Sequence, residues 1–504
     1  MAVLLSILLL FLKLKATEAV SSLTIETTSG PVTGLITGTT PNVAQFLGIP
    51  YSEQPVGERR WLSPVLKSRE ESIDATKFGH GCPQFENDRS STYHTDAPEF
   101  LTPANTTGED CLPLNIWTPW KQNGNGSERL PTGAGNIEYQ VPSRWIERTQ
   151  KHIVVGIKAI SIEPELSYRV NIFGFPNAAG LSTSEQNLGL LDQRVGLEWI
   201  RDNIANFGGD PARIILWGQS AGAMSVDYYN FAYPEDPIVS GLIMDSGNAF
   251  LQINSVDPAH SNFTFVASYF GCGNLSAQSE LDCFRKIPSV DIISFLESWA
   301  DKAKTPAISF NPIADDRTKF ANISARAMAG NFIKKPAIAG TNSNEGASLV
   351  PYDRVNGPDT TLSNATTLGA FLCPTVKTTT LRYAEGVPTF RYLYDGNFSN
   401  IAPQWWEGAY HSTELPLLFG TSGIVRGEST AFEIQVSMKM QDYWVAFAQD
   451  PQNGLPAKGW NVYIPEGNAI LFGSNNIVTQ PIAETRLEAP CNQQFPKPGG
   501  IPPP

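Results

Sequence analysis

Histidine and cysteine are scarce in this chain, with five and six residues respectively among 504. No two cysteines have the spacing of a zinc site, and no group of histidines lies near a cysteine, so we expect no bound metal. Ser/Gly linkers, charge blocks and internal repeats are absent as well. Although the length alone would favour about three domains, we expect one domain over residues 20–494 and a flexible Pro/Gly tail over residues 495–504.

Long apolar runs are missing from all but the start of the chain. Residues 3–12 form an apolar stretch that is too short to span a bilayer, and small residues follow it. We interpret residues 1–19 as a secretory signal peptide that is cleaved after Ala19. Lys13 and Lys15 follow the apolar stretch instead of preceding it, which leaves a short anchor as the alternative. No later segment has the character of a transmembrane helix.

Basic residues are outnumbered, because 36 Lys and Arg stand against 49 Asp and Glu, for a net charge of −13. This balance argues against nucleic acids and anionic membrane surfaces as partners. It does not restrict the choice of a neutral substrate, and the oligomeric state stays open.

Features typical of exported proteins are frequent. Six cysteines fit an oxidising compartment, and spacing alone does not decide how they pair, although Cys272 and Cys283 are close enough to staple one small loop. Seven Asn-x-Ser/Thr sequons are consistent with a secreted, extracellular glycoprotein. The sequon residues are Asn105, Asn125, Asn262, Asn274, Asn322, Asn364 and Asn397.

Strand and helix patterns alternate along the chain. Residues 23–51 alternate β-forming residues with Gly and Pro, which indicates short antiparallel strands. Residues 188–205 have an apolar face with helical spacing that stops at the glycines 208–209. The pattern predicts an α/β fold with a large, mostly parallel central sheet flanked by helices and a small N-terminal antiparallel sheet. Further strands are predicted at 153–155, 214–217, 242–244, 337–339 and 390–394.

The most informative motif is Gly-Gln-Ser-Ala-Gly at residues 218–222, which follows the apolar run 214–217 directly. A buried strand, a tight turn and a helix over 221–229 together are typical of a nucleophile elbow. Glycines on both sides of the serine remove side chains that would clash in the strained turn. We therefore predict that Ser220 is a nucleophile; the alternative is an ordinary strand-to-helix turn that contains a serine.

A serine hydroxyl needs a base to remove its proton, and imidazole suits that task near neutral pH. In α/β-hydrolases the order along the chain is serine, acid, histidine, and only His260 and His411 follow Ser220. His260 lies two residues before a sequon, in a stretch expected at the surface, so we favour His411. Of the several carboxylates between Ser220 and His411, we single out Glu345 as the acid. It follows the predicted strand 337–339 through a polar turn, and α/β sites form at such strand ends. The alternative is that Glu345 is a solvated loop charge.

Long segments of the chain resemble the type-B carboxylesterase/lipase family, the cholinesterase-like α/β-hydrolases, and are most similar to its secreted fungal members. The matching segments are 46–51 (Phe-Leu-Gly-Ile-Pro-Tyr), 109–117 (Glu-Asp-Cys-Leu-Pro-Leu-Asn-Ile-Trp), 168–175 (Tyr-Arg-Val-Asn-Ile-Phe-Gly-Phe), 189–194 (Gly-Leu-Leu-Asp-Gln-Arg), 207–211 (Phe-Gly-Gly-Asp-Pro), the serine motif, 340–346 and 411–420.

The resemblance implies an α/β-hydrolase fold and a hydrolase that acts on small-molecule or lipid esters without a metal or an organic cofactor. It implies that Ser220 is the nucleophile, Glu345 the acid that orients the histidine, and His411 the general base in a two-step acyl transfer. The backbone N–H of Ala221 would supply one donor to the oxyanion. The disulfides that the resemblance implies are Cys82–Cys111, Cys272–Cys283 and Cys373–Cys491.

The chain departs from this family near the oxyanion hole. The family has an apolar strand that ends in a Gly-Gly-Gly-Phe-like loop, whereas here Pro131 runs directly into Thr132-Gly133-Ala134-Gly135. About a dozen extra residues, 156–167, follow nearby. A strand-sized deletion and a short insertion suggest, as a hypothesis, wrongly placed exon boundaries. If the chain is as written, we expect neighbouring strand edges to be left unpaired and the rate to fall, since one lost oxyanion donor costs about 10²–10³.

Two other functions compete with a secreted serine esterase. A catalytically dead relative that serves in binding or adhesion would fit the missing oxyanion loop, but such a protein has no need of Ser220, Glu345 and His411 together. A true lipase needs an apolar lid, which the family carries in the loop between Cys82 and Cys111. That loop is mostly polar here, which favours a general esterase.

Overall fold

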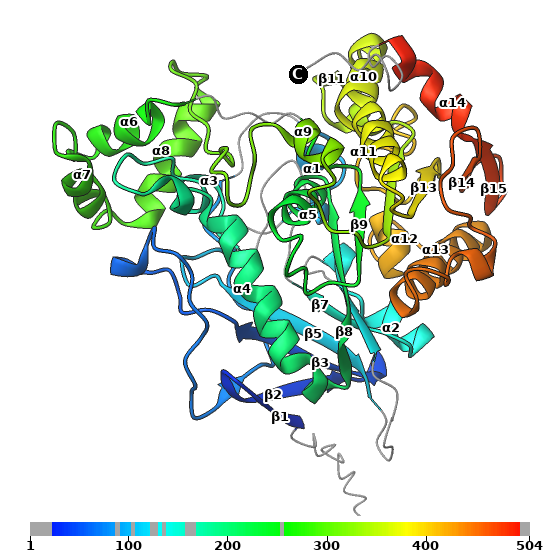
Figure 1. The fold of residues 1–504 in the computed structure, drawn as a ribbon, viewed down its shortest axis with the longest axis horizontal. Coiled ribbons are helices and arrows are strands. Elements are labelled where there is room, and N and C mark those ends of the chain that lie inside the picture. The colour runs from blue at the N-terminus through cyan, green and yellow to red at the C-terminus, as the bar shows by residue number, and fades with distance from the viewer. Residues whose placement is uncertain are drawn as a thin grey trace, which may run out of the picture.

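The computed structural model describes residues 23–85, 91–101, 106–120, 130–133, 138–156, 168–251 and 257–493. The expected signal peptide and the C-terminal tail lie outside these residues, as do Asn105 and Asn125. Most of the described strands join one 13-stranded sheet (Figure 1). Its strands are β1 (Leu23–Thr27), β2 (Gly30–Thr37), β3 (Thr40–Pro50), β4 (Ile73–Asp74), β5 (Pro113–Pro119), β6 (Leu130–Gly133), β7 (Ile153–Gly156), β8 (Gly209–Gln219), β9 (Gly241–Asp245), β10 (Ala337–Asn342), β13 (Thr389–Tyr394), β14 (Asn468–Phe472) and β15 (Thr479–Ala483).

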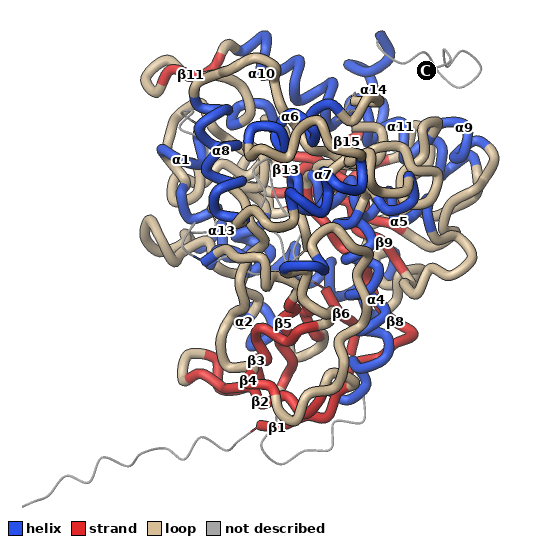
Figure 2. Tube along the Cα trace, turned by 90° about the vertical axis from the view of Figure 1, so that its left-hand side faces the viewer, coloured by secondary structure: helices blue, strands red, loops and turns tan. Residues whose placement is uncertain are grey.

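The sheet has an antiparallel beginning and a parallel centre. The strands β1, β2, β3, β5 and β7 pair antiparallel in that order. From β7 the order continues through β6, β8, β9, β10, β13 and β14, and all these pairs are parallel. The predicted α/β class is therefore confirmed, with the N-terminal antiparallel strands running on into the central sheet. Figure 2 shows these early strands gathered at the lower end of the molecule.

The strand β6 corrects the expectation that the sheet lacks a strand between β7 and β8. Thr132 pairs with Ile153 of β7 on one side and with Ile214 of β8 on the other. Its sequence shows little apolar alternation, so the pairing is imposed by the two flanking strands rather than by local preference. The strand is short and ends at Gly133, whereas β8 continues for five residues beyond Ile214.

Helices cover both faces of this sheet. On one face α4 and α5 pack on β8, while on the other face α13 packs on β6 and β8, beside α12. The helices are α1 (Thr92–Thr95), α2 (Ser143–Thr149), α3 (Asn171–Gly174), α4 (Leu188–Asn203), α5 (Ala221–Ala232), α6 (Ser261–Tyr269), α7 (Ala277–Phe284), α8 (Ser289–Asp301), α9 (Ile323–Met328), α10 (Thr360–Thr366), α11 (Cys373–Ala384), α12 (Leu415–Phe419), α13 (Ala431–Gln449) and α14 (Glu484–Glu488).

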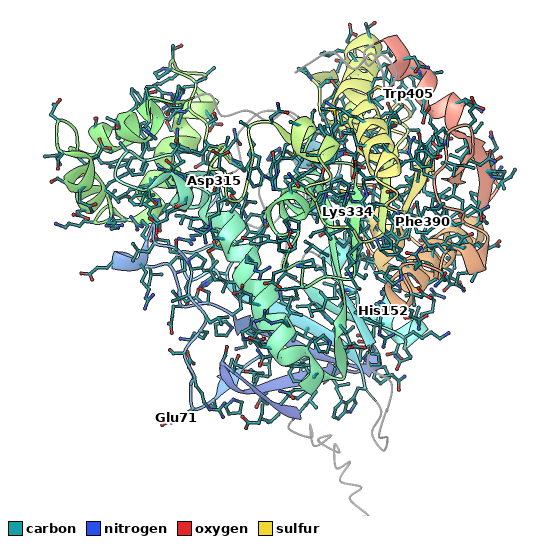
Figure 3. The ribbon with its side chains drawn as sticks, in the orientation of Figure 1. Glu71, His152, Asp315, Lys334, Phe390 and Trp405 are labelled. Carbon is teal, nitrogen blue, oxygen red and sulfur yellow. A yellow bond between two sulfur atoms is a disulfide. The ribbon has the colours of Figure 1, made fainter. Side chains whose placement is uncertain are left out.

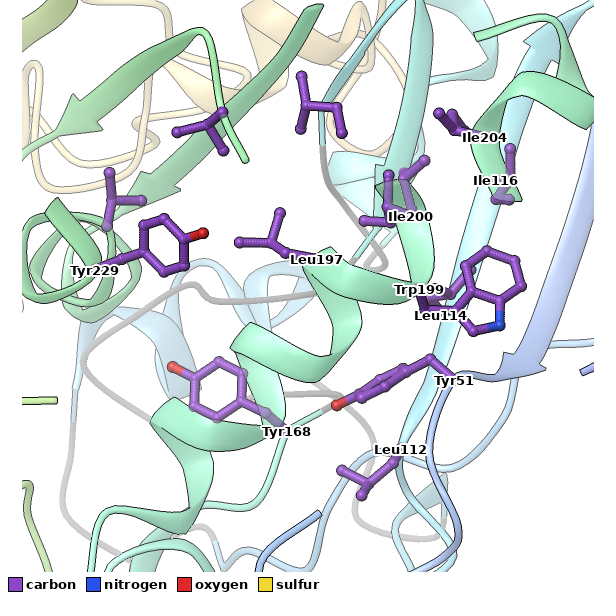
Figure 4. Close-up of a cluster of buried hydrophobic side chains, with 14 of the residues drawn as sticks. Tyr51, Leu112, Leu114, Ile116, Tyr168, Leu197, Trp199, Ile200, Ile204 and Tyr229 are labelled. Atoms are coloured by element: carbon purple, nitrogen blue, oxygen red, sulfur yellow. The ribbon is translucent and has the colours of Figure 1, made fainter. Parts of the chain in front are cut away.

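The two faces of the central strands bury different side chains, because alternate residues of a strand point in opposite directions. Leu242 and Met244 of β9 join the core under α4 and α5, whereas Ile243 joins the core with Trp444 of α13. Figure 4 shows part of the first core, with Leu197 and other α4 side chains lying against the strands. The predicted elements around Ser220 are therefore present, and α4 ends at the glycine pair through a 3₁₀ turn, Ile204–Phe207.

A separate helical lobe forms from α6, α7 and α8 and lies at the upper left of Figure 1. Its core contains Phe263, Phe284 and Phe295 together with Trp61, whose ring packs against those of Phe263 and Phe284. The disulfide between Cys272 and Cys283 lies within it. The other disulfides join Cys82 to Cys111 and Cys373 to Cys491, so the structure contains the pairs that the resemblance implies.

The described residues contain no helix with the length and apolar character needed to cross a bilayer. Within the same ranges, no cluster of three or more His, Cys, Asp or Glu is placed to hold a metal ion. Of the sequon asparagines that the structure describes, Asn262 is half-buried and the others are exposed: Asn274, Asn322, Asn364 and Asn397.

Candidate active site

Ser220 stands at the sharp turn between β8 and α5. Its backbone has φ 56° and ψ −123°, a conformation that costs a non-glycine residue of order 1–3 kcal/mol. The turn is so tight that a Cβ at Gly218 would lie 2.3 Å from the carbonyl of Gly222. The Ser220 N–H donates to Asp245 O at 2.9 Å, which ties the turn to β9. The glycine requirement predicted for the elbow is thus visible in the contact between Gly218 and Gly222.

Glu345 and His411 form a hydrogen-bonded pair. Glu345 follows β10 after a two-residue turn, and His411 lies in the loop before α12. His411 Nδ1 lies 2.6 Å from Glu345 Oε2, and both side chains are fully buried. The second oxygen of Glu345 accepts a hydrogen bond from the Asn342 N–H at 2.7 Å. Because the carboxylate accepts from Nδ1–H, the other ring nitrogen of His411 carries the lone pair that a general base needs.

The loop that carries His411 is held by two aromatic residues. Tyr93 donates from its hydroxyl to His411 O at 2.7 Å, and its ring packs edge-on against Tyr410. Phe371 lies with its ring centre 4.8 Å from that of the imidazole. It belongs to a π-helical turn, Thr367–Leu372, between α10 and α11, and such turns are frequent at functional sites.

The His411 nitrogen that faces away from Glu345 contacts Gln219 rather than Ser220. Gln219 Nε2 lies 3.2 Å from His411 Nε2. The described residues show no hydrogen bond between the Ser220 hydroxyl and His411. The structure therefore brings Glu345 and His411 together, and the elbow residue that contacts the imidazole is Gln219, the residue before Ser220.

Two further buried carboxyl groups lie near Glu345. Asn342 Nδ2 donates to Glu414 Oε2 at 2.5 Å, and Asp245 accepts from Trp217 Nε1 at 2.5 Å and from the Tyr392 hydroxyl at 2.9 Å. Burial raises the pKa of Asp245 to about 7, and it raises the pKa of Glu414 well above its usual value, with a further contribution from the charge of Glu345. Burial thus favours the neutral acid at both positions while Glu345 faces the imidazole.

The oxyanion hole is described only in part. Ala221 begins α5, so its N–H points to the start of the helix beside Ser220. β6 ends at Gly133, and residues 134–137, which follow it, lie outside the described residues.

Several residues of the site were not found from the sequence. Gln219 could have been noticed from its place directly before the nucleophile, on the strand face opposite to its neighbours. Tyr93 and Phe371 had no signal of their own, because their contacts join segments far apart in the chain. Asn342 lies three residues before Glu345 and could have been noticed from that place. The neighbouring tryptophans before His411 differ in burial: Trp406 is buried against Tyr352, while Trp405 is 75% exposed and lies at the outer edge of the molecule in Figure 3.

The family relationship agrees with this geometry. A sequence model described as "Carboxylesterase family" matches residues 21–368 and 353–488. The chain belongs to the carboxylesterase family. It is therefore a carboxylic ester hydrolase with the α/β-hydrolase fold.

Three relatives illustrate the spread of this family. The chain is 44% identical to chlorogenic acid esterase of Aspergillus niger over 86% of its own length and 83% of the relative. It is 39% identical to secreted lipase 5 of Gibberella zeae over 94% of this chain and 95% of that protein. It is 26% identical to acetylcholinesterase of Bungarus fasciatus over 94% of this chain and 87% of the relative.

Proposed function

We propose that this carboxylesterase is a secreted serine hydrolase that forms an acyl-enzyme on Ser220. The observation that carries the proposal is the buried His411–Glu345 hydrogen bond of 2.6 Å, which directs the lone pair of the imidazole to Nε2, the nitrogen that faces the elbow residue Gln219. Ser220, His411 and Glu345 then have the roles of nucleophile, general base and orienting acid.

In the first step, His411 Nε2 takes the proton from the Ser220 hydroxyl while its oxygen attacks the ester carbonyl. The imidazolium donates that proton to the leaving alcohol, and an acyl-enzyme remains. Water then repeats the attack, with His411 again as the base. Glu345 stabilises the imidazolium in both steps, and its own position is fixed by the Asn342 N–H.

The carboxyl groups of Asp245 and Glu414 lie near Glu345, and their protonation leaves Glu345 as the charge that stabilises the His411 imidazolium. With Glu414 protonated, and with Asp245 protonated below about pH 7, the negative charge facing His411 belongs to Glu345. A second ionised carboxylate beside Glu345 would be repelled by it in this buried region. The raised pKa values of Asp245 and Glu414 therefore follow from the same burial that makes the Glu345–His411 pair effective.

The transition state needs N–H donors for the developing oxyanion, and the Ala221 N–H is the donor that the elbow supplies. A Gly-rich loop after β6 is absent from the sequence, so we expect a lower rate than in relatives with a complete hole. Each missing donor costs about 10²–10³ in kcat.

We infer that soluble esters are the substrates rather than lipid droplets. The segment 91–101, which lies inside the loop closed by Cys82 and Cys111, is fastened to the body of the protein. Tyr93 bonds to His411 O, and Asp96 pairs with Arg354 at 2.8 Å. A segment held by these contacts is poorly suited to act as a mobile lid. Because the chain is similar to a chlorogenic acid esterase, chlorogenic acid is the first ester to test as a substrate.

Export is part of the proposal. The three disulfides fit an oxidising compartment, and four of the sequon asparagines are exposed and so accessible to glycosylation. Expression of the full-length gene product tests export. A secreted protein that begins after Ala19 and loses mass on treatment with a glycosidase would support this part of the proposal. Retention in the membrane fraction would instead favour the short anchor.

The deciding experiment compares hydrolysis of p-nitrophenyl acetate and butyrate by the secreted chain and by its Ser220→Ala variant. We expect activity that disappears with Ser220, and a weak response to emulsified triglyceride. Strong preference for the emulsion would overturn the choice of soluble esters. A folded protein that hydrolyses neither p-nitrophenyl ester would favour a catalytically dead binding protein. The missing Gly-rich loop after β6 is consistent with that alternative.

A further inference from the structure

Gln219 reaches the imidazole because of its place in β8. It shares a strand face with Ile215 and Trp217, since alternate side chains of a strand point the same way. Ile215 lies in the core on the α13 side of the sheet, which also contains Tyr410, the residue before His411. Ser220 follows in the strained turn, so the side chain before the nucleophile is the one directed at His411.

The contact between Gln219 and His411 has a definite donor. His411 Nδ1–H is committed to Glu345, which leaves a lone pair on Nε2. The Gln219 amide nitrogen, 3.2 Å away, therefore donates to that lone pair. The opposite amide orientation would place the Gln219 oxygen against the lone pair and is excluded by repulsion. Gln219 and His411 are 1% and 0% exposed, so water does not compete for the contact.

This hydrogen bond uses the lone pair that catalysis needs. One ring nitrogen accepts from one donor along its lone-pair direction, and the base must accept the Ser220 proton there. While Gln219 donates to His411 Nε2, the Ser220 hydroxyl has no base.

In the part of the chain that the structure describes, the carbonyl end of the Gln219 amide makes no hydrogen bond that would hold the side chain in place. Gln219 Oε1 is buried and has no hydrogen-bond partner among the described residues. The bond to His411 is thus the one polar contact of this carboxamide that the structure shows, and a single neutral hydrogen bond is worth about 1 kcal/mol. The side chain has little else to retain it at the imidazole.

We propose that Gln219 is a positioning residue that occupies His411 Nε2 in the resting protein and gives it up when Ser220 becomes the donor. This inference rests on the proposed serine mechanism. Removing the amide should speed the reaction of Ser220, by about five- to tenfold if one hydrogen bond of typical strength is broken. A residue with a merely structural role would, when replaced, slow that reaction.

The test is the second-order rate of modification by phenylmethanesulfonyl fluoride. In this reaction the Ser220 oxygen bonds to sulfur, its proton passes to His411, and the S–F bond breaks to release fluoride. The full-length protein is compared with its Gln219→Met and Gln219→Leu variants. Met keeps the length and flexibility of Gln without a donor, and Leu provides a second shape. The site of modification is located by peptide mass spectrometry.

Gln84→Leu is the matched control. Gln84 is buried and, like Gln219, has a carboxamide oxygen without a partner in the structure. We expect faster modification of Ser220 in both Gln219 variants, with a rise in kcat for p-nitrophenyl butyrate, and no change in Gln84→Leu.

Equal or slower modification of both Gln219 variants, with wild-type Ser220 still modified, would overturn the role of Gln219 and leave the serine mechanism standing. Absence of modification at Ser220 in the wild type and in both variants would overturn both proposals.

Discussion

The imidazole of His411 and the carboxylate of Glu345 are joined by a 2.6 Å hydrogen bond, and neither side chain is exposed. The contact sets the tautomer, because a carboxylate accepts but does not donate. It also places a negative charge where the imidazolium forms during acyl transfer, in a region from which solvent is excluded.

Replacement of this carboxylate by an amide is therefore the sharpest test of the acid. Glu345→Gln keeps the shape, but its NH₂ group can hold the wrong tautomer, as in serine proteases, where the equivalent change costs about 10⁴ in kcat. We expect a loss of about 10³–10⁴ in kcat for p-nitrophenyl butyrate with little change in KM. The matched control is Glu71→Gln at the molecular edge seen in Figure 3. A variant that keeps a tenth of the activity would contradict the assignment.

Asp245 makes stability depend on pH. Burial raises its pKa from the usual 3.8 to about 7, so the folded protein retains a proton that the unfolded chain loses. Stability is then full below about pH 4 and falls as the pH rises towards about 7. Asp245→Asn removes this loss, and we expect its free energy of unfolding, relative to wild type, to improve by on the order of 4 kcal/mol between pH 4 and 8.

Urea unfolding at both pH values measures this difference. The exposed Asp110 offers the control Asp110→Asn, which should leave the pH dependence as it is. If Asp245→Asn and wild type lose stability in parallel between pH 4 and 8, the carboxyl group of Asp245 does not carry the effect.

The disulfides should differ in how much each contributes to the free energy of unfolding. Cys373 and Cys491 are 118 residues apart, whereas Cys272 and Cys283 are 11 apart. Closing the longer loop removes more entropy from the unfolded chain, so the chain-entropy model gives about 5 kcal/mol for the first and about 3 kcal/mol for the second. Paired Cys→Ala variants, compared by urea unfolding, should rank in that order. The reverse order would mean that strain or residual structure outweighs loop closure.

The sequence predicted the parts of the site that follow buried strands. Ser220 and Glu345 each come after an apolar run whose strand character is local, and His411 followed from chain order. Gln219 was missed because its contact with His411 spans 192 residues and depends on how the later loop packs. The strand β6 was missed for the opposite reason: four residues with little β pattern are paired by β7 and β8 on either side.

The origin of the unusual segment after Pro131 can be tested on the transcript. If exon boundaries are misplaced, the cDNA contains a strand and a Gly-rich loop here and lacks much of 156–167. A cDNA that reads Pro131-Thr132 and retains 156–167 would remove this explanation, and the short β6 would then belong to the protein itself.

The last prediction restores the oxyanion donors. β6 pairs with β7 through Thr132 and Gly133 and with β8 through Leu130 and Thr132, so a strand inserted before Thr132 would take the place of Thr132 and Gly133 between the same two neighbours. Adding an apolar strand and Gly-Gly-Gly-Phe between Pro131 and Thr132 should raise kcat by at least about 10², the value of one donor. The same insertion with Ala-Ala-Ala-Phe is the control, because its Cβ atoms oppose close approach of the backbone to the substrate. A gain in the glycine version alone would show that the missing donors limit the rate; equal rates in both, no higher than wild type, would mean that the hole is completed by other backbone.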